Sequence, residues 1–234
     1  MFARRCSLAV LAALIAVLPA CSGEDTEQGD SLPPARQLVE NSANTAAGIT
    51  STHFAVDVNG TVPGFGVESI DGDLSMKGQD VAAKGTAVIT AFGAAAEAEF
   101  VLTDGTLYLN TGGGNYQEIP ESQAKLVYDF SAVLDPERGV AKLIRNLSGP
   151  TTVAEEDVNG TATYKITGTA TKDDIAGLVP SAKSDVDVTL WVSKENGNQP
   201  VKAAAKFPGG GGEGGTVTVT LSDVNEPVAV APPK

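Results

Sequence analysis

The stretch EAEFVLTDGTLYLN, residues 97–110, decides the fold class of this chain. Glu97 and Glu99 alternate with apolar residues, which is the period of a strand with one buried and one wet face. Asp104-Gly105 follows at once, and this dipeptide favours the tight two-residue turn of a β-hairpin. A second run of apolar and polar residues comes directly after the turn. The stretch therefore predicts two antiparallel strands in a sheet that buries one face.

The same period of two extends outward in both directions. Alternating runs cover residues 54–58, 70–77, 87–91 and 96–102 and, later in the chain, the runs TYKITGTA, DVDVTLWVS, VKAAAKF and GTVTVTLSD. Three further Asn-Gly dipeptides between such runs predict hairpin turns, at residues 59–60, 159–160 and 196–197. Asp71-Gly72 lies inside a run, where either a hairpin turn or a β-bulge fits.

Three helices interrupt the strand-like runs. The first is expected from Pro33-Pro34 to about Thr50, with a narrow apolar stripe. The second is PERGVAKLIRNL, residues 136–147, which begins after Asp135 as N-cap, and the third begins at Thr171 and stops before Pro180. The order helix, strands, helix, strands, helix, strands predicts an α+β fold. We expect one curved antiparallel sheet with helices on its concave face.

The N-terminus reads as an export and anchoring segment. Arg4 and Arg5 precede an apolar run of 11 residues, 7–17, which is shorter than the roughly 20 residues of a membrane span and fits a signal peptide. LPACSGEDTEQGD, residues 18–30, then places Cys21 after a small residue, an arrangement that resembles the bacterial lipobox, whose cysteine is acylated. The alternative is an ordinary secreted protein with a stray cysteine.

These features predict the domain organisation and the location. We expect a lipoprotein signal peptide at residues 1–20, an acylated Cys21 with a flexible tether at 21–33, and one domain at 34–234. The protein is then lipid-anchored to the cell membrane on its extracytoplasmic side, in the periplasm or cell wall. Two or more acyl chains anchor a protein stably, whereas one does so only marginally.

The charge of the chain excludes several classes of partner. A formal net charge of −13 argues against binding of nucleic acid and against electrostatic docking on anionic lipid headgroups. The contact with the membrane must therefore come from the lipid on Cys21. This cysteine is the only one left after removal of the signal peptide, so the mature chain forms no internal disulfide and no cysteine-based zinc or redox site.

Motifs for catalysis are missing from the sequence. The one histidine, His53, starts a strand-like run, and no G-x-S-x-G nucleophile motif accompanies it. The glycine-rich run 208–215 lacks the Lys-Ser/Thr ending of a phosphate-binding loop, and Trp191 is assigned to the outer face of the sheet rather than to a sugar platform. We therefore expect a protein that is not an enzyme and that uses no metal and no cofactor.

Small residues are frequent on the inward face of the sheet, and they have two explanations. The positions are Ala87, Ala91, Ala96, Ala98, Ala203 and Ala205. They let helices pack closely, in keeping with a normal interior density of about 0.75. Alternatively, they leave room for a ligand between walls that include Phe54, Phe92, Phe100, Leu102 and Tyr108.

Five segments resemble, in the same order, the LppX/LprA/LprF/LprG family of mycobacterial and related actinobacterial lipoproteins. They are STHFAVDVNGTVPGF, ESIDGDL, EAEFVLTDGTLYLN, YDFSAVLDPERGVAKLIRNL and VTLWVS, and the likeness runs from about residue 34 to 230. LDPERGVAKLIRNL is the most specific of the matching pieces. One departure is that some relatives have a Trp-Gly pair in the last strand, where this chain has LSDVNEPVAV.

The resemblance implies a fold and a function. The family has a half-open, strongly bent sheet, a half-barrel akin to the carriers LolA and LolB, which encloses an apolar cavity for acyl chains. Its members bind acylated lipids or glycolipids and carry them across the cell envelope, for which a membrane transporter is an expected partner. The implied cavity wall is Val56, Val58, Ile70, Leu74, Ala87, Ile89, Ala98, Phe100 and Leu102 from the sheet, with Val133, Leu134, Val140, Leu143 and Ile144 from the helical side.

One alternative function stays open beside the carrier. The same domain with a filled core and no lipid cargo would be an envelope scaffold, which acts through its acidic surface on another envelope protein.

Overall fold

A computed structural model describes residues 32–62, 64–78, 80–91, 94–125, 128–209 and 214–234. Residues 32–234 form one compact unit. The predicted signal peptide, Cys21 and nearly all of the predicted tether lie outside the described residues, as do Phe92 and half of the glycine-rich run.

The described residues form one open antiparallel sheet of 11 strands with five helices. The strands are β1 Ser51–Gly60, β2 Val67–Lys77, β3 Asp80–Ala91, β4 Ala94–Thr103, β5 Thr106–Asn110, β6 Gln117–Pro120, β7 Ser148–Val158, β8 Thr161–Ala170, β9 Val186–Ser193, β10 Pro200–Phe207 and β11 Gly215–Ser222. The helices are α1 Ala35–Ala47, α2 Glu121–Ala124, α3 Ser131–Leu134, α4 Val140–Arg145 and α5 Lys172–Ile175. This architecture confirms the predicted α+β class and the single antiparallel sheet.

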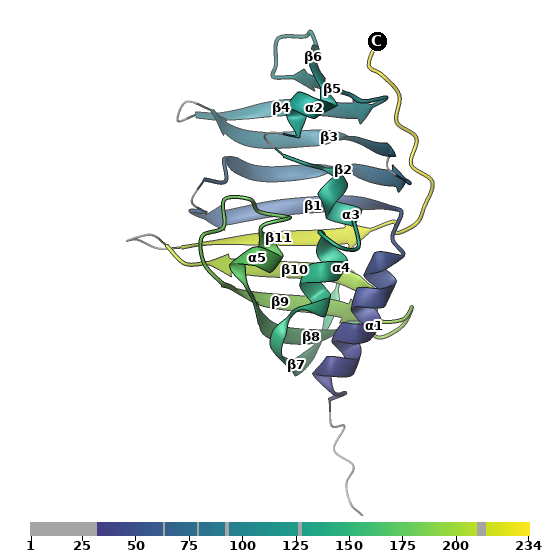
Figure 1. Cartoon of the computed structure of the whole chain (residues 1–234), viewed down its shortest axis with the longest axis vertical. Coiled ribbons are helices and arrows are strands. Elements are labelled where there is room, and N and C mark those ends of the chain that lie inside the picture. The colour runs from purple at the N-terminus through teal and green to yellow at the C-terminus, as the bar shows by residue number, and fades with distance from the viewer. Residues whose placement is uncertain (1–31, 63, 79, 92–93, 126–127, 210–213) are drawn as a thin grey trace, which may run out of the picture. The chain divides into compact units, whose positions relative to one another are not determined.

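The strand order explains how the helices come to cover one face of the sheet. The order is β6-β5-β4-β3-β2-β1-β11-β10-β9-β8-β7, so the first and last strands pair in the middle, while β6 and β7 form the two edges. The chain must therefore return from one edge to the other between residues 120 and 148. It does so across one face, through α2, α3 and α4 (Figure 1).

The stretch 97–110 forms the hairpin that its pattern predicts. Strands β4 and β5 pair with Thr103 opposite Thr106. The two residues between them, Asp104 and Gly105, have φ angles of 51° and 73°. Positive φ at both positions is the geometry of a type I′ turn, whose twist matches that of the two strands.

The other Asx-Gly dipeptides have different outcomes. Asn159-Gly160 joins β7 to β8 directly, and Asn196-Gly197 lies in the connection of β9 to β10, so both are turns as predicted. Asn59-Gly60 is not a hairpin turn, because it ends β1 in register with β11 and the chain reaches β2 only at Val67.

Asp71-Gly72 is neither a turn nor a bulge but an ordinary pair of positions in β2. Gly72 lies opposite Gly85 of β3 in an unbroken register. A Cβ atom on Gly85 would lie 2.2 Å from the carbonyl oxygen of Asp71, so the two strands approach too closely for a side chain there. Glycine therefore permits a close contact inside the sheet at this point, and the dipeptide rule for turns does not apply.

Helix lengths differ from the predictions, although the positions agree. Helix α1 ends three residues earlier than expected, at Ala47. Helix α5 begins as predicted, because Thr171 accepts a hydrogen bond from the backbone N–H of Asp174 at 3.3 Å. Helix α4 begins only at Val140. Gly139 before it has non-helical dihedral angles, φ −101° and ψ −147°. Residues 135–139 form a turn closed by a 2.8 Å bond from the N–H of Gly139 to the carbonyl of Asp135. The short helices α2 and α3 were not predicted.

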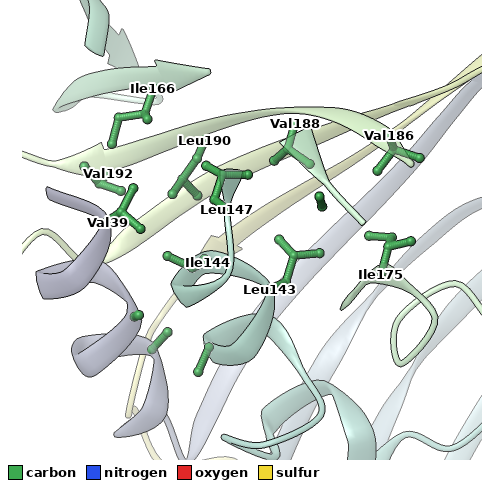
Figure 2. Packing of buried hydrophobic residues seen from close by; sticks show 14 of the residues in the cluster. Val39, Leu143, Ile144, Leu147, Ile166, Ile175, Val186, Val188, Leu190 and Val192 are labelled. Carbon is green, nitrogen blue, oxygen red and sulfur yellow. The ribbon is translucent and has the colours of Figure 1, made fainter. Parts of the chain in front are cut away.

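Two buried clusters hold the domain together, one under each half of the sheet. Under β8–β10, the side chains of α1, α4 and α5 face Ile166, Leu190 and their neighbours (Figure 2). Under β2–β4, a second cluster combines Leu74, Phe100 and Leu102 with Leu134 of α3. Full burial of such side chains contributes about 1.5–3 kcal/mol each, so these two clusters supply much of the stability that disulfides cannot give.

Candidate functional site

A cavity of about 730 Å³ lies between the sheet and the helices that cross it. Its lining draws on both buried clusters, with Ile144 and Leu190 from one and Leu74 and Phe100 from the other. The volume lies within the range of about 300–1000 Å³ that is typical of small-molecule sites. Nearly all of the lining side chains are apolar, so the space suits hydrocarbon rather than a charged ligand.

Cross-strand pairing explains why space remains at this place. Val219, Val56, Ile70, Ala87 and Ala98 lie opposite one another in turn across β11, β1, β2, β3 and β4. All five line the cavity, and the row ends in two alanines whose side chains reach only a short way above the sheet. Because the core helices pack mainly against β8–β10, Ala87 and Ala98 border open volume, which favours the second explanation for these two positions. Ala203 and Ala205 also line the cavity but pack against the helix-covered cluster, and Ala96 does not line it.

Twelve of the fourteen residues of the implied wall line this cavity. They are Val56, Ile70, Leu74, Ala87, Ile89, Ala98, Phe100, Val133, Leu134, Val140, Leu143 and Ile144. The other two do not border it: Val58 packs against the cluster under β8–β10, and Leu102 lies in the buried cluster that also includes the lining residue Leu74. The geometry places the twelve around one space, and their contact with a lipid stays a prediction.

Tyr108 does not belong to the cavity wall. Its neighbours Leu107 and Leu109 line the cavity, so the side chain of Tyr108 points to the other face of β5. Side chains alternate between the two faces of a strand, so an assignment that is wrong by one residue places every side chain on the wrong face. In β5 the cavity face carries Leu107 and Leu109, and Tyr108 between them lies on the other face.

Several lining residues escaped the sequence reasoning. They come from two connections, at Gly64–Val67 and Leu178–Ser181, from the segment around Tyr128 and Phe130, and from Val217, Val219 and Leu221 of β11. The alternation in β11 was visible, but its place beside β1 was not. Leu178 and Val179 lie inside the helix expected to run up to Pro180, but the pattern did not place that helix beside the cavity, and residues 64–66 have no period.

Aromatic contacts fix the segment that closes the cavity over β4. The ring of Phe130 stacks on Phe100 with centroids 5.8 Å apart, and Tyr128 meets Phe130 edge-on at 5.1 Å. Burial raises the pKa of the Tyr128 hydroxyl to about 12, so this group stays neutral at physiological pH. No charge therefore develops at this part of the wall.

An ionic network holds the same segment from outside. The guanidinium of Arg138 bonds Asp129 at 3.0 Å and Asp135 at 2.8 Å. Partial burial would raise the pKa of Asp129, but hydrogen bonds from Ser131 and Arg138 outweigh it and lower that pKa below its usual value. The charged state of this network thus persists at neutral pH and ties the turn after α3 to Asp129 before that helix.

His53 lies on the opposite face of the sheet from the cavity. Its neighbours Thr52 and Phe54 line the cavity, and its own ring faces the carboxylates of Asp71 and Asp73. Its Nδ1 lies 2.9 Å from Asp73 Oδ1, and this hydrogen bond is the main cause that raises the pKa of His53 above 6.5. Within the described residues, no group of three or more His, Cys, Asp or Glu side chains is placed to hold a metal ion.

The raised pKa of His53 predicts a small dependence of stability on pH. The protonated imidazole stabilises the folded state fully below the unfolded pKa of about 6.5, and this contribution is lost as pH rises through the higher folded pKa. Because the His53 side chain is 33% exposed, we expect a loss of less than about 1 kcal/mol between pH 6 and 8.5. The free energy of unfolding, measured by urea titration at several pH values, tests this expected loss.

His53→Gln should flatten this pH profile and leave any binding in the cavity unchanged. Asp73→Asn, which removes the main partner, is the matched variant and should flatten it as well. If the free energy of unfolding depends on pH in both variants as it does in the wild type, a group other than His53 causes that dependence.

Trp191 lies on the outer face of β9, as assigned from the sequence. Its indole N–H donates to Glu156 at 2.6 Å, and the ammonium groups of Lys165 and Lys202 lie 5.2 and 4.9 Å from the ring centroid. The lysines shield the ring, which is only 8% exposed. Since Trp191 is the one tryptophan in the sequence, its fluorescence reports on unfolding from a position away from the cavity.

Helices that could cross a bilayer do not occur in the described part of the chain, because none of them is both long and apolar enough.

Comparison with known proteins agrees with this geometry. The family model of the LppX_LprAFG lipoprotein matches residues 34–230. The lipoarabinomannan carrier protein LprG of Mycolicibacterium smegmatis is 34% identical, over 99% of this chain and 97% of its own length. The protein of the same name from Mycobacterium tuberculosis H37Rv is 30% identical, over 97% and 94%.

Two solved structures share the fold. LprF from Mycobacterium bovis superimposes with a TM-score of 0.75 at 26% identity, covering 85% of this chain and 96% of its own. The lipoprotein LppX from Mycobacterium tuberculosis gives a TM-score of 0.64 at 25% identity, covering 86% and 100%.

Proposed function

Because this chain belongs to the LppX_LprAFG lipoprotein family, we propose that it is a membrane-anchored carrier of acylated lipids or glycolipids. It binds them in the cavity under the sheet and helps to transfer them across the cell envelope, without catalysis. The observation that carries the proposal is the apolar cavity of about 730 Å³. Relatives that are named as lipoarabinomannan carriers support a glycolipid cargo.

The energetics of lipid transfer explain what such a cavity achieves. Each methylene moved out of water contributes about 0.8 kcal/mol, so one 16-carbon chain faces a barrier of about 12 kcal/mol when it crosses water unaided. A dry apolar cavity replaces the membrane interior during the crossing and removes most of this barrier. No acid, base or metal takes part in the process.

The anchor is the second part of the proposal. The apolar run 7–17 and the lipobox-like residues 18–21 support removal of residues 1–20 and acylation of Cys21. The polar residues that follow then form a hydrated tether at the extracytoplasmic side of the cell membrane. The lipid on Cys21 would hold the protein in place, separate from the lipid in the cavity, and a membrane transporter would supply or accept the cargo.

A transfer assay between vesicles tests the proposal. Donor vesicles of phosphatidylcholine contain a self-quenched fluorescent diacyl lipid, acceptor vesicles contain none, and the full chain carries Cys21→Ser so that no acyl group is attached to it. We expect transfer at least about tenfold faster than without protein, since sheltering only two methylenes lowers the barrier by about 1.6 kcal/mol. Transfer at the protein-free rate would favour the envelope scaffold instead.

A further inference from the structure

The two ends of the strands differ in the charge of their connections. The strands run antiparallel, so successive connections fall alternately at one end and at the other. At one end, the connections β2–β3, β4–β5 and β9–β10 each have a charged residue in or beside them, namely Lys77, Asp104 and Lys194. At the other end, which faces left in Figure 1, the connections β1–β2, β3–β4 and β5–β6 belong to stretches without a charged residue: 58–67, 85–96 and 105–117.

The connection that carries α5 lies at the same uncharged end, and its residues 175–182 have no charge either. Gly64 of the β1–β2 connection meets it there, because a Cβ atom on Gly64 would lie 2.9 Å from the Cβ of Ser181. Charged residues make up 19% of the chain, so two touching connections that both lack them form a distinct part of the surface.

The cavity reaches the surface between these two connections. Gly64 and Gly66 are exposed to solvent and also line the cavity, as does Pro180 after α5. A glycine has no side chain, so little more than one backbone separates its solvent side from its cavity side. We call this place the uncharged mouth, and its residues are Gly64, Phe65, Gly66, Leu178 and Pro180.

The uncharged mouth combines apolar side chains with backbone that is already hydrogen-bonded. Phe65 and Leu178 are half-buried, line the cavity and pack against the cluster under β8–β10. The N–H of Phe65 donates to the carbonyl of Val62 at 3.1 Å, and the N–H of Leu178 donates to the carbonyl of Ile175 at 2.9 Å. These two donors therefore keep their partners when water leaves the mouth.

A different environment surrounds Gln123 of α2, which is also exposed and lines the cavity. It lies at the charged end of the strands, where the N–H of Glu121 donates to the carbonyl of Gly105 at 2.9 Å. Glu121 and Lys125 flank Gln123 and form an ion pair of 2.8 Å. An apolar surface that covered Gln123 would have to remove water from both charges, which is costly.

A lipid bilayer is the partner that fits the uncharged mouth. A surface of apolar side chains and satisfied backbone can enter the headgroup region without dehydrating an ion, and its binding grows with the apolar area that it buries. Acyl chains that enter a cavity from the bilayer itself also avoid a passage through water. The carboxylates that give the chain its net charge of −13 lie outside this mouth.

We propose that the uncharged mouth docks on the surface of a lipid bilayer and that acyl chains enter and leave the cavity there. This inference rests on the proposed carrier function and gives the protein a second, reversible membrane contact beside the predicted anchor at Cys21. The contact is hydrophobic, so it requires no anionic headgroup.

Flotation with phosphatidylcholine vesicles tests the docking surface. The full chain carries Cys21→Ser, and the ratio of vesicle-bound to free protein is measured. Gly66 accepts a side chain, since a Cβ atom there would lie 3.7 Å from the nearest atom, the carbonyl oxygen of Thr90. Gly66→Glu should lower the ratio at least about fivefold, because its carboxylate loses water when the mouth is covered.

Two matched variants isolate the charge at the mouth. Gly66→Gln adds a side chain of the same size without the charge and should dock like the wild type. Gln123→Glu adds the same charge beside the cavity at the other end of the strands and should also dock like the wild type. Pro180→Glu brings the charge to the mouth from the second connection and should act like Gly66→Glu. Melting temperatures identify the folded variants, and Pro180→Glu serves if Gly66→Glu does not fold.

The outcomes separate this inference from the carrier function. Wild-type docking of the folded mouth variants overturns the docking surface, even if the protein transfers lipid. An equal loss in Gly66→Gln or Gln123→Glu also overturns it, because bulk or net charge would then decide. A wild-type protein that transfers lipid but does not float with the vesicles overturns it too and leaves the mouth to a protein partner. Docking that the mouth variants abolish, without any transfer of lipid, supports the docking surface and contradicts the carrier function.

Discussion

Replacement of Ala98 by tryptophan is expected to reduce lipid loading at least tenfold while the domain stays folded. Ala98 is 3% exposed and lies opposite Ala87, and both residues border the cavity. An indole ring built from this position has open volume to enter, so the core need not expand. Displacing only two methylenes of a bound chain costs about 1.6 kcal/mol, which is more than tenfold in affinity.

A matched variant separates the loss of volume from a general effect of the bulky residue. Thr86 precedes Ala87 in β3, is exposed and points to the other face, so Thr86→Trp should load lipid like the wild type. Ala87→Trp should behave like Ala98→Trp. Uptake from phosphatidylcholine vesicles and melting temperatures are measured on all three variants. Wild-type loading in folded Ala98→Trp would mean that this residue does not border the binding volume.

The second large effect concerns stability and distinguishes residues that fill the core from residues that line the cavity. Ile166 is fully buried against the helices and does not border the cavity, so Ile166→Ala should cost about 2–5 kcal/mol. Ile70 borders the cavity and has fewer neighbours to lose on that side. Ile70→Ala should therefore cost less than about 2 kcal/mol.

Urea unfolding of the lipid-free protein, followed through the fluorescence of Trp191, measures both losses with the same change of side chain. The free energy of unfolding must fall with urea concentration at the same slope in the wild type and in both variants, since a changed slope would indicate an altered denatured state. If Ile70→Ala costs as much as Ile166→Ala, Ile70 fills a packed core, and the scaffold alternative gains support. A lower cost for Ile70→Ala, together with weaker lipid uptake, agrees with a cavity that a ligand fills.

The class of the fold was accessible from the sequence because each strand carries its own signal. Alternation in residues 97–110 and the Asp104-Gly105 turn required no knowledge of distant partners. The pairing of β1 with β11 was not accessible, since His53 and Ser222 are opposite neighbours that lie far apart in the chain. Helix α4 is shorter than its pattern because the backbone at Gly139 is not helical, which apolar periodicity does not reveal.

The candidate site was predictable where it is built from strands and not where it is built from connections. Strand parity placed Ile70, Ala87 and Ala98 on one face, and the family resemblance suggested that this face borders a cavity. Parity does not show which inward residues border the cavity: Leu102 does not, although Leu74 and Phe100 of the same buried cluster do. Ser181 lies in a turn without any period, so no sequence pattern places it in the lining.

The central claim is that the cavity carries acyl lipid, and native mass spectrometry of the purified protein tests it most directly. The full chain with Cys21→Ser is produced in a mycobacterial host, so that any acyl lipid in the spectrum is bound and not attached through Cys21. We predict a mass above that of the polypeptide, with an acylated lipid released on activation, and a lipid-free mass for Ala98→Trp. A lipid-free mass for the wild-type protein, with no uptake from added lipid vesicles, would contradict the claim.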